Sequence, residues 1–363
     1  MALFERRTLE AVGVDIGTSS VKVMELQRTR RGYRVNCAAV ESLPRNAVVE
    51  RGISDVEQVG AALRRATKRA RCKRKNAIVA IASSHVITRT FQLPEGIKAF
   101  EIEEQVMIDA AQNVPYSVDE MYLDYQVLAS MEAGAEDSVT VTACRREVVD
   151  DYVSAVESAG LRPVVVDVDT FAIARAFPLV TATMSESLQG KAVALLDVGE
   201  VTTRLDVFVD GTVIYDRDHS FGGRSLTESI QSHCDISFEE AEAVKLSRNL
   251  SEDDQEQLLE PFKRTISEEA ARALEFFASA GRGYDTVDLL FVTGGCLRLD
   301  GILELISNYT GVPTATANPF LGKNIKARTK LKLQPTVKIK PQNPLFRFTQ
   351  RVSHINTQNP PLT

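Results

Sequence analysis

The sequence predicts a mixed α/β fold built from two related lobes. Strand-like runs alternate with stretches whose apolar residues recur at helical spacing, and one strand–turn–strand pattern occurs twice. The chain has 363 residues, of which 44% are hydrophobic and 25% charged, so it can bury a large core. Apolar runs such as 77–82 are far shorter than the roughly 20 residues that a membrane span needs.

In the first half of the chain, a β-rich segment is followed by a helix and by further strands. The expected helix at 55–71 follows a Ser54-Asp55 cap and carries apolar residues at helical spacing. A later helix, at 147–159, ends at Gly160. The other elements expected here are strands at 11–16, 21–26, 33–40, 77–82, 86–93, 124–129, 139–145 and 164–168, and a helix at 100–113.

The pattern then starts again. VGVDIGTSSVKVMEL at 12–26 and VALLDVGEVTTRLDVFV at 193–209 both read as a strand, an Asp-x-Gly turn and a returning strand. We interpret this as a duplicated supersecondary unit, which implies two related lobes. The elements expected after the first strand of the repeat are strands at 203–209, 212–215 and 288–292, a long helical stretch at 238–280 and a helix at 300–309.

Charge is distributed unevenly along the chain. Residues 1–304 hold 34 Lys/Arg against 49 Asp/Glu, a net charge of −15, whereas the last 59 residues have nine Lys/Arg and no acid. The proline-containing segment from 322 to 363 is predicted to be a flexible basic tail. A second basic run, 64–75, is predicted to be a solvated helix face, with contact to anionic lipid or acidic partners as the alternative. The acidic body and the lack of interleaved aromatic residues argue against nucleic acid as a partner.

Several common sites are absent from the sequence. It contains no GxxxxGK[ST], GxGxxG, GxSxG or HExxH motif, and its four histidines are scattered. The five cysteines form no CxxC pair, and we expect them to be reduced and mostly buried. The first ten residues lack the apolar core of a signal peptide, so we expect a cytoplasmic protein.

The two Asp-x-Gly turns indicate a nucleotide site between the lobes. In the first turn, Gly17 allows backbone N–H groups to converge on phosphate oxygens, and the hydroxyls of Thr18 and Ser19 add donors. Asp15 is a hard oxygen ligand suited to Mg²⁺ through water, and Lys22 can reach the terminal phosphates from the returning strand. The second turn offers Asp197, Gly199, Thr202 and Thr203, and Gly294 and Gly295 would permit the close approach of a base or ribose.

These residues resemble the actin/Hsp70/hexokinase superfamily of ATP-binding proteins. Its first phosphate loop is DxG[ST] with a lysine seven residues after the aspartate, its second is DxGxxxT, and its adenosine motif is an apolar strand followed by [ST]GG, here Thr293 to Gly295. The resemblance implies a two-lobed actin-like fold of duplicated RNase H-like units, with ATP and Mg²⁺ in the cleft. It also implies a ribose contact by Glu242 and Lys245 and a second carboxylate on the magnesium side, Asp169, so that the expected metal set is Asp15, Asp169 and Asp197, mostly through water.

Within the superfamily, residues 8–321 resemble the PilM family of type IV pilus assembly proteins. The segments that show the resemblance are VITRTFQLPEGI at 86–97, the stretch 100–128, VTACRREVV at 141–149, AGLRPVVVDVDTFAIARAF at 159–177, and FGGRSLTESIQ at 221–231. Gly222 and Gly223 of the last segment are also expected to contact the nucleotide. Family members usually end in an apolar strand and helix, which the tail of this chain does not show.

The resemblance implies a division of the chain into sub-domains, with an FtsA-like extra sub-domain inserted in the first lobe. The expected parts are the lobe 1 core at 8–85 and 163–190, the inserted sub-domain on the peptide-partner side at 86–162, the lobe 2 core at 191–225 and 285–321, the lobe 2 helical sub-domain at 226–284, and the tail at 322–363.

By resemblance, the function is that of a cytoplasmic scaffold in pilus biogenesis and twitching motility, recruited to the inner membrane. The implied partners are the N-terminal tail of a PilN-like membrane protein, other pilus platform proteins and motor ATPases. No general base can be assigned, so ATP hydrolysis stays open, and so do three alternatives: an FtsA-like cell-division protein, a sugar-kinase-type phosphotransferase and a nucleotide-independent scaffold.

Overall fold

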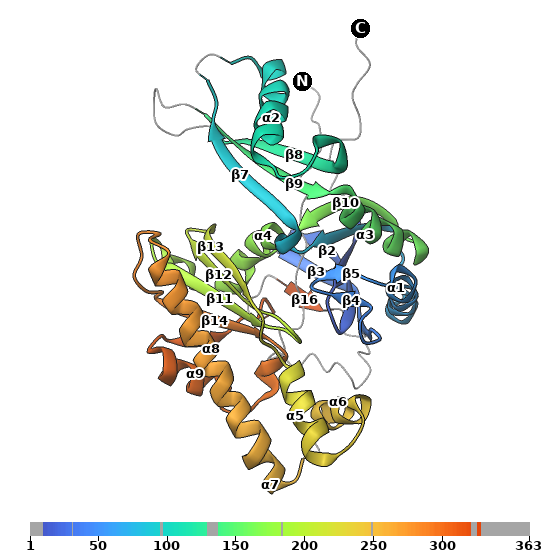
Figure 1. The fold of residues 1–363 in the computed structure, drawn as a ribbon, viewed down its shortest axis with the longest axis vertical. Coiled ribbons are helices and arrows are strands. Elements are labelled where there is room, and N and C mark those ends of the chain that lie inside the picture. The colour runs from blue at the N-terminus through green and yellow to red at the C-terminus, as the bar shows by residue number, and fades with distance from the viewer. Residues whose placement is uncertain are drawn as a thin grey trace.

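Two lobes and a smaller sub-domain make up the molecule (Figure 1). The computed structural model describes residues 10–30, 32–94, 97–128, 137–182, 184–247, 250–320 and 325–327. Within these residues no helix is long and apolar enough to cross a membrane.

The first lobe is built on a six-stranded sheet in the order β10-β6-β1-β2-β3-β16. β1 runs antiparallel to β2 and parallel to β6, which in turn runs parallel to β10. A two-stranded ribbon, β4 with β5, follows β3. The strands are β1 Val12–Ile16, β2 Ser20–Thr29, β3 Gly32–Ser42, β4 Val48–Val49, β5 Gly52–Ile53, β6 Asn76–Ile81, β10 Arg162–Val168 and β16 Ile325–Ala327.

Helices cover both faces of this sheet. α1 (Val56–Ala70) and α3 (Arg146–Ser158) share one core with β1 and β6, and α4 (Asp169–Thr181) packs on the opposite face. The predicted cap of α1 is confirmed, because the Asp55 side chain accepts a hydrogen bond from the Gln58 N–H at 2.9 Å.

The small sub-domain is inserted between β6 and β10 and lies at the top of Figure 1. Its antiparallel sheet has the order β7-β9-β8, and α2 packs on it through Val106 and Ala110. The elements are β7 Val86–Gln92, α2 Ala99–Asn113, β8 Met121–Leu128 and β9 Ser138–Arg145, with short 3₁₀ turns at Ser83–His85 and Val118–Glu120.

The second lobe repeats the topology of the first. In its sheet, ordered β13-β12-β11-β14-β15, β11 runs antiparallel to β12 and parallel to β14, as β1 does to β2 and β6. One face packs on α8 and α9 and the other on α4, so α4 lies between the two sheets. The elements are β11 Ala192–Val198, β12 Thr203–Val209, β13 Thr212–His219, β14 Leu289–Gly294, β15 Thr314–Thr316, α8 Glu260–Ser279 and α9 Ile302–Thr310, with 3₁₀ turns at Ser185–Leu188 and Gly295–Arg298.

The helical part of lobe 2 differs from the prediction of one long helical stretch at 238–280. A separate helix, α7, begins at a Ser251 cap, and a π-helical turn then leads into α8, whose first turn contains Pro261. Within α8 the side chains of Ile266, Ala270 and Phe277, which recur at helical spacing, are buried. The elements are α5 Arg224–Cys234, α6 Phe238–Ser247, α7 Glu252–Asp254 and the π-helical turn Gln255–Leu259.

Two further expectations need correction. The predicted flexible tail was expected to begin at 322, but Ile325–Ala327 forms β16, which pairs with β3 and buries Ile325. The rest of that tail lies outside the described residues. The cysteines were expected to be reduced, yet Cys37 and Cys72 form a disulfide that links β3 to the loop after α1, while Cys144, Cys234 and Cys296 are free.

Candidate functional site: a cleft between the lobes

A cleft of about 1960 Å³ lies between the two lobes, and both Asp-x-Gly turns line it. The turns close in the same way: Gly17 N–H donates to Ser20 O at 3.0 Å, and Gly199 N–H donates to Thr202 O at 3.0 Å. The predicted duplication therefore extends from the order of the strands to single hydrogen bonds.

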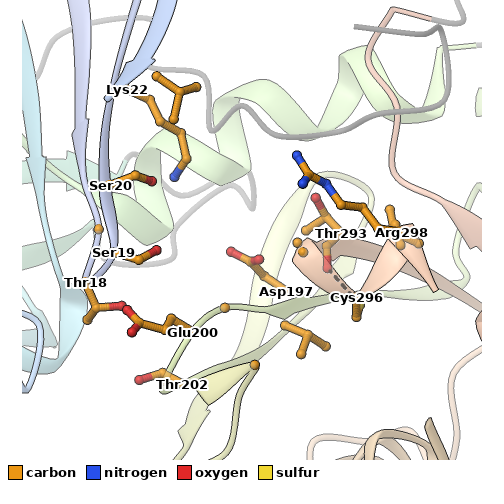
Figure 2. A pocket seen from close by; sticks show the side chains of 18 of the residues that line it. Thr18, Ser19, Ser20, Lys22, Asp197, Glu200, Thr202, Thr293, Cys296 and Arg298 are labelled. Carbon is orange, nitrogen blue, oxygen red and sulfur yellow. Dashed lines mark hydrogen bonds between the residues drawn. The ribbon is translucent and has the colours of Figure 1, made fainter. Parts of the chain in front are cut away.

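The first turn forms one wall of the cleft. Asp15 is paired in register with Lys22 across β1 and β2, and Lys22 Nζ lies 2.7 Å from Asp15 Oδ2. Figure 2 shows Thr18, Ser19, Ser20 and Lys22 along this wall. The cation is thus held in the cleft beside the carboxylate.

The second turn forms the opposite wall. Asp197 lies near the end of β11, beside Thr293 of β14, and its carboxylate points into the space between the lobes (Figure 2). Glu200, in the same turn, faces Thr18 of the first turn in this view. One oxygen of Glu200 accepts from the Arg224 guanidinium at 3.1 Å, whereas Oε2 is buried and has no hydrogen-bond partner among the described residues. A buried acceptor without a donor is costly, so this oxygen is suited to receive a hydrogen bond from a ligand.

The Gly-Gly pair brings β14 very close to β11. A Cβ at Gly294 would lie 2.2 Å from the backbone oxygen of Val198, and φ at Gly294 is +98°, so this position requires glycine. A Cβ at Gly295 would meet nothing within 4 Å. The open space at Gly295, which lines the cleft, would admit the flat surface of a ligand.

The expected ribose contacts lie at the α5–α6 side of the cleft. Lys245 Nζ is 2.5 Å from Glu242 Oε2 and donates to Thr227 Oγ1 at 2.6 Å, and both Lys245 and Glu242 line the cleft together with Gly223.

Two other predicted residues lie behind the lining of the cleft. Thr203 is buried and donates to Phe221 O at 2.9 Å, and a Cβ at Gly222 would lie 2.3 Å from Glu200 O. Thr203 and Gly222 therefore support the second turn.

Asp169 lines the base of the cleft but takes part in ion pairs. One of its oxygens pairs with Arg51, and the other accepts from Ser83 N–H at 3.0 Å and lies 3.5 Å from Arg204. A carboxylate so fully engaged is better suited to joining the lobes than to holding a metal. The expected role of Asp169 at the magnesium stays a prediction.

Magnesium fits this site only through water and phosphate. Among the described residues, no three His, Cys, Asp or Glu side chains lie together as a metal-binding group. Mg²⁺ in phosphate sites usually keeps several waters and contacts one or two carboxylates. Asp15 and Asp197, which line the cleft from opposite lobes, suit that arrangement.

A buried network that the sequence did not reveal joins the lobes beneath the cleft. Arg204 of β12 is 1% exposed, and its Nε donates to Asp206 Oδ1 at 2.8 Å. Its Nη atoms donate to Thr170 Oγ1 and Ser83 Oγ, each at 2.5 Å, on the lobe 1 side. Burial raises the pKa of Asp206 to about 7, although Arg204 opposes that shift.

Other cleft residues also escaped the sequence reasoning. Arg45 of lobe 1 lies over the Phe238 ring of lobe 2, 4.5 Å from its centroid, so a cation–π contact crosses between the lobes. Arg298 lines the cleft just after the Gly-Gly pair (Figure 2). Glu200 and Arg298 lie within a few residues of the recognised motifs, which was the only signal for them, whereas nothing in the sequence connects Arg45 with Phe238.

Comparison with known families decides the classification. The family model described as type IV pilus assembly protein PilM matches residues 13–338. The chain belongs to the PilM family. The match runs past residue 321, where the resemblance in the sequence was expected to end.

One solved structure similar to this chain contains PilM, and other solved structures and curated relatives share its fold. The structure titled "PilM-PilN type IV pilus biogenesis complex" is similar at a TM-score of 0.70 and 25% identity, covering 88% of this chain and 91% of that one. The ethanolamine utilization protein EutJ from Carboxydothermus hydrogenoformans is similar in fold, at a TM-score of 0.50 and 17% identity over 85% of this chain and 84% of its own. The cell division protein FtsA of Bacillus subtilis (strain 168) is 23% identical over 355 residues, covering 85% of this chain and 78% of FtsA. The fold is thus the two-lobed actin-like fold with an extra sub-domain, and the protein is an actin-like member of a type IV pilus assembly family.

Proposed function

We propose that this protein is an ATP-binding scaffold of the pilus assembly platform, which binds the N-terminal tail of a PilN-like membrane protein. The observation that carries the proposal is the pair of matched turns that face each other across one cleft, with Asp15 and Lys22 on one wall and Asp197 on the other. Two lobes that grip one ligand change their angle when it binds, so ligand binding can alter a distant partner site.

The residues of the cleft can be assigned roles toward ATP. Backbone N–H groups and hydroxyls of Thr18 and Ser19 would donate to phosphate oxygens, and Lys22 would neutralise the terminal phosphates. Asp15 and Asp197 would hold the waters of a phosphate-bound Mg²⁺. Glu242 and Lys245 would contact the ribose, and the open space at Gly295 would admit the base. Bound ATP and Mg²⁺ would supply a charged bridge between the lobes, and no group in the cleft is assigned as a general base.

The small sub-domain supports the peptide part of the proposal. β8 is the last strand of the order β7-β9-β8, so one of its edges is open to an added strand within the described sheet. Tyr125, Val127 and Leu128, near the end of β8, are exposed apolar side chains. At its other end, β8 meets lobe 1, where Tyr122 OH donates to Asp150 of α3 at 3.1 Å. A peptide on this edge would touch both the sub-domain and lobe 1, and would therefore sense their arrangement.

The first experiment titrates the protein with a peptide of the first ten or so residues of a candidate PilN-like partner, with and without ATP and Mg²⁺. We expect binding that changes in affinity at least severalfold when the nucleotide is added. The double variant Val127→Glu, Leu128→Glu should lose binding, because it charges the open edge. Phe100→Glu on α2, another exposed apolar position, is the matched control and should bind normally.

The outcomes separate the alternatives. Absence of peptide binding both with and without ATP would contradict the scaffold assignment. Equal affinity with and without ATP would favour a nucleotide-independent scaffold, and phosphoryl transfer to a small hydroxyl compound would favour a kinase. An FtsA-like division role is the remaining alternative, and its test is binding of a cell-division partner in place of the pilus peptide.

A further inference from the structure

A set of cations lies at the end of lobe 1 that is opposite the cleft. β1 and β6 run parallel, with Val12 beside Ala77, so Asp15 marks the cleft end and the loop before Asn76 marks the other end. β2 runs antiparallel to β1, with Glu25 opposite Val12, and continues beyond the start of β1. The hairpin that joins β2 to β3 therefore also lies at the end away from the cleft. We call the exposed cations at this place the basic edge, which comprises Arg28, Arg30, Lys68, Arg71, Lys73 and Lys75.

Among the described residues, these six cations form no ion pair, whereas neighbouring cations do. Arg65 and Arg69 of α1 pair with Glu41, and Arg74 pairs with Glu10 and Glu25. No ion pair within the described part of the chain involves a member of the basic edge. Residues 1–304 carry a net charge of −15, so the positive charge at this end of lobe 1 contrasts with the negative charge of the other parts of that segment.

The composition of the basic edge favours one class of partner. Stable protein interfaces have an apolar or aromatic centre and are depleted in lysine. None of the described large hydrophobic side chains that are exposed lies on the β2–β3 hairpin, the last turns of α1 or the loop to β6. Lipid head groups, by contrast, attract spread-out cations without any apolar contact. The Cys37–Cys72 disulfide also holds the lysine-bearing loop against β3, so the charges keep a fixed arrangement.

We propose that the basic edge lies against anionic phospholipid head groups. None of the basic-edge residues lines the cleft or belongs to β8. The contact would orient the molecule on a negatively charged membrane surface through electrostatic attraction alone, so it weakens as salt screens the charges.

The test is co-sedimentation of the purified full chain with vesicles, without ATP or peptide. Wild-type protein should bind phosphatidylglycerol-containing vesicles and not phosphatidylcholine vesicles, and binding should fall as salt rises. The triple variant Lys68→Glu, Lys73→Glu, Lys75→Glu should bind at least about tenfold more weakly, since each cation near an anionic surface contributes measurably. The matched control, Lys191→Glu, Arg264→Glu, Arg282→Glu, makes the same charge change at exposed cations of lobe 2 and should bind like the wild type or only slightly more weakly.

Three results would overturn the proposal. The first is equal binding of the wild type to neutral and anionic vesicles, and the second is an equal loss of vesicle binding in both triple variants. The third is a lysine variant that binds vesicles like the wild type but no longer binds a polyglutamate peptide or duplex DNA that the wild type binds. Thermal unfolding of both variants shows whether each is folded, and all three lysines are exposed and make no side-chain bond among the described residues. Because nucleotide and peptide are absent from the assay, failure here leaves the proposed function untouched.

Discussion

Gly294 and Gly295 are neighbours, yet they meet different physical constraints. The backbone at Gly294 has a positive φ and passes so close to Val198 that no side chain fits. Gly295 faces open space at the lining of the cleft. The sequence motif alone marks both as ligand contacts, but the structure separates a folding requirement from a binding one.

We therefore predict opposite results for two alanine variants. Gly294→Ala should lower the free energy of unfolding by at least about 2 kcal/mol, because the new Cβ forces β14 away from β11 in a strained conformation. Gly295→Ala should leave stability nearly unchanged and weaken nucleotide binding. Urea unfolding measures the first effect and equilibrium dialysis the second. Equal destabilisation by both substitutions would contradict this distinction.

Among the elements, α4 and the ionic network around its first turn join the lobes. α4 packs against both sheets, and Arg51 pairs with Asp169 at its start and with Asp218 of β13, at 2.6 Å. Removing one partner of a buried ion pair leaves a charge without compensation. This network joins the two lobes beside the cleft.

Arg51→Ala should lower the free energy of unfolding by about 3 kcal/mol, since the buried Asp169 and the partly buried Asp218 each lose one of their ion-pair partners. The control is Arg272→Ala, which breaks an exposed pair with Glu269 at 2.9 Å and should cost less than about 1 kcal/mol. Chemical denaturation of both variants provides the comparison. If the two values agree, the network does not hold the lobes.

Most elements could be predicted from local patterns, and the exceptions have clear causes. Strand pairs such as β1–β2 and β11–β12 are runs rich in apolar residues on either side of an Asp-x-Gly turn, so sequence alone predicts them. No helix was predicted at α4, which contains Pro178, and β16 lies within a segment whose composition predicts a flexible tail. β16 and the Cys37–Cys72 disulfide each depend on contact between residues that are far apart in the sequence. No local sequence pattern predicts such contacts.

The same division holds for the candidate site. The two turns and the Gly-Gly pair were recognisable because each is a contiguous motif. Arg204 was not, because its partners Ser83 and Thr170 come from the other lobe. A charged side chain within a strand suggests an exposed face, and only the fold shows that Arg204 is buried among carboxylates.

For the whole molecule, the central claim is that a duplicated unit builds one nucleotide site from two lobes. The same turn, closed by the same hydrogen bond, approaches the cleft from each side. A ligand that bridges both turns would therefore depend on Asp15 and Asp197 together, and neither lobe could hold it alone.

The most direct test is equilibrium binding of labelled ATP, with Mg²⁺, to the wild type and to the double variant Asp15→Ala, Asp197→Ala. The control is Asp253→Ala, Asp285→Ala, which removes two exposed carboxylates outside the cleft. We predict that the cleft variant binds at least about tenfold more weakly, a difference of about 1.4 kcal/mol or more, while the control binds like the wild type. Equal ATP affinity in all three proteins would contradict the account.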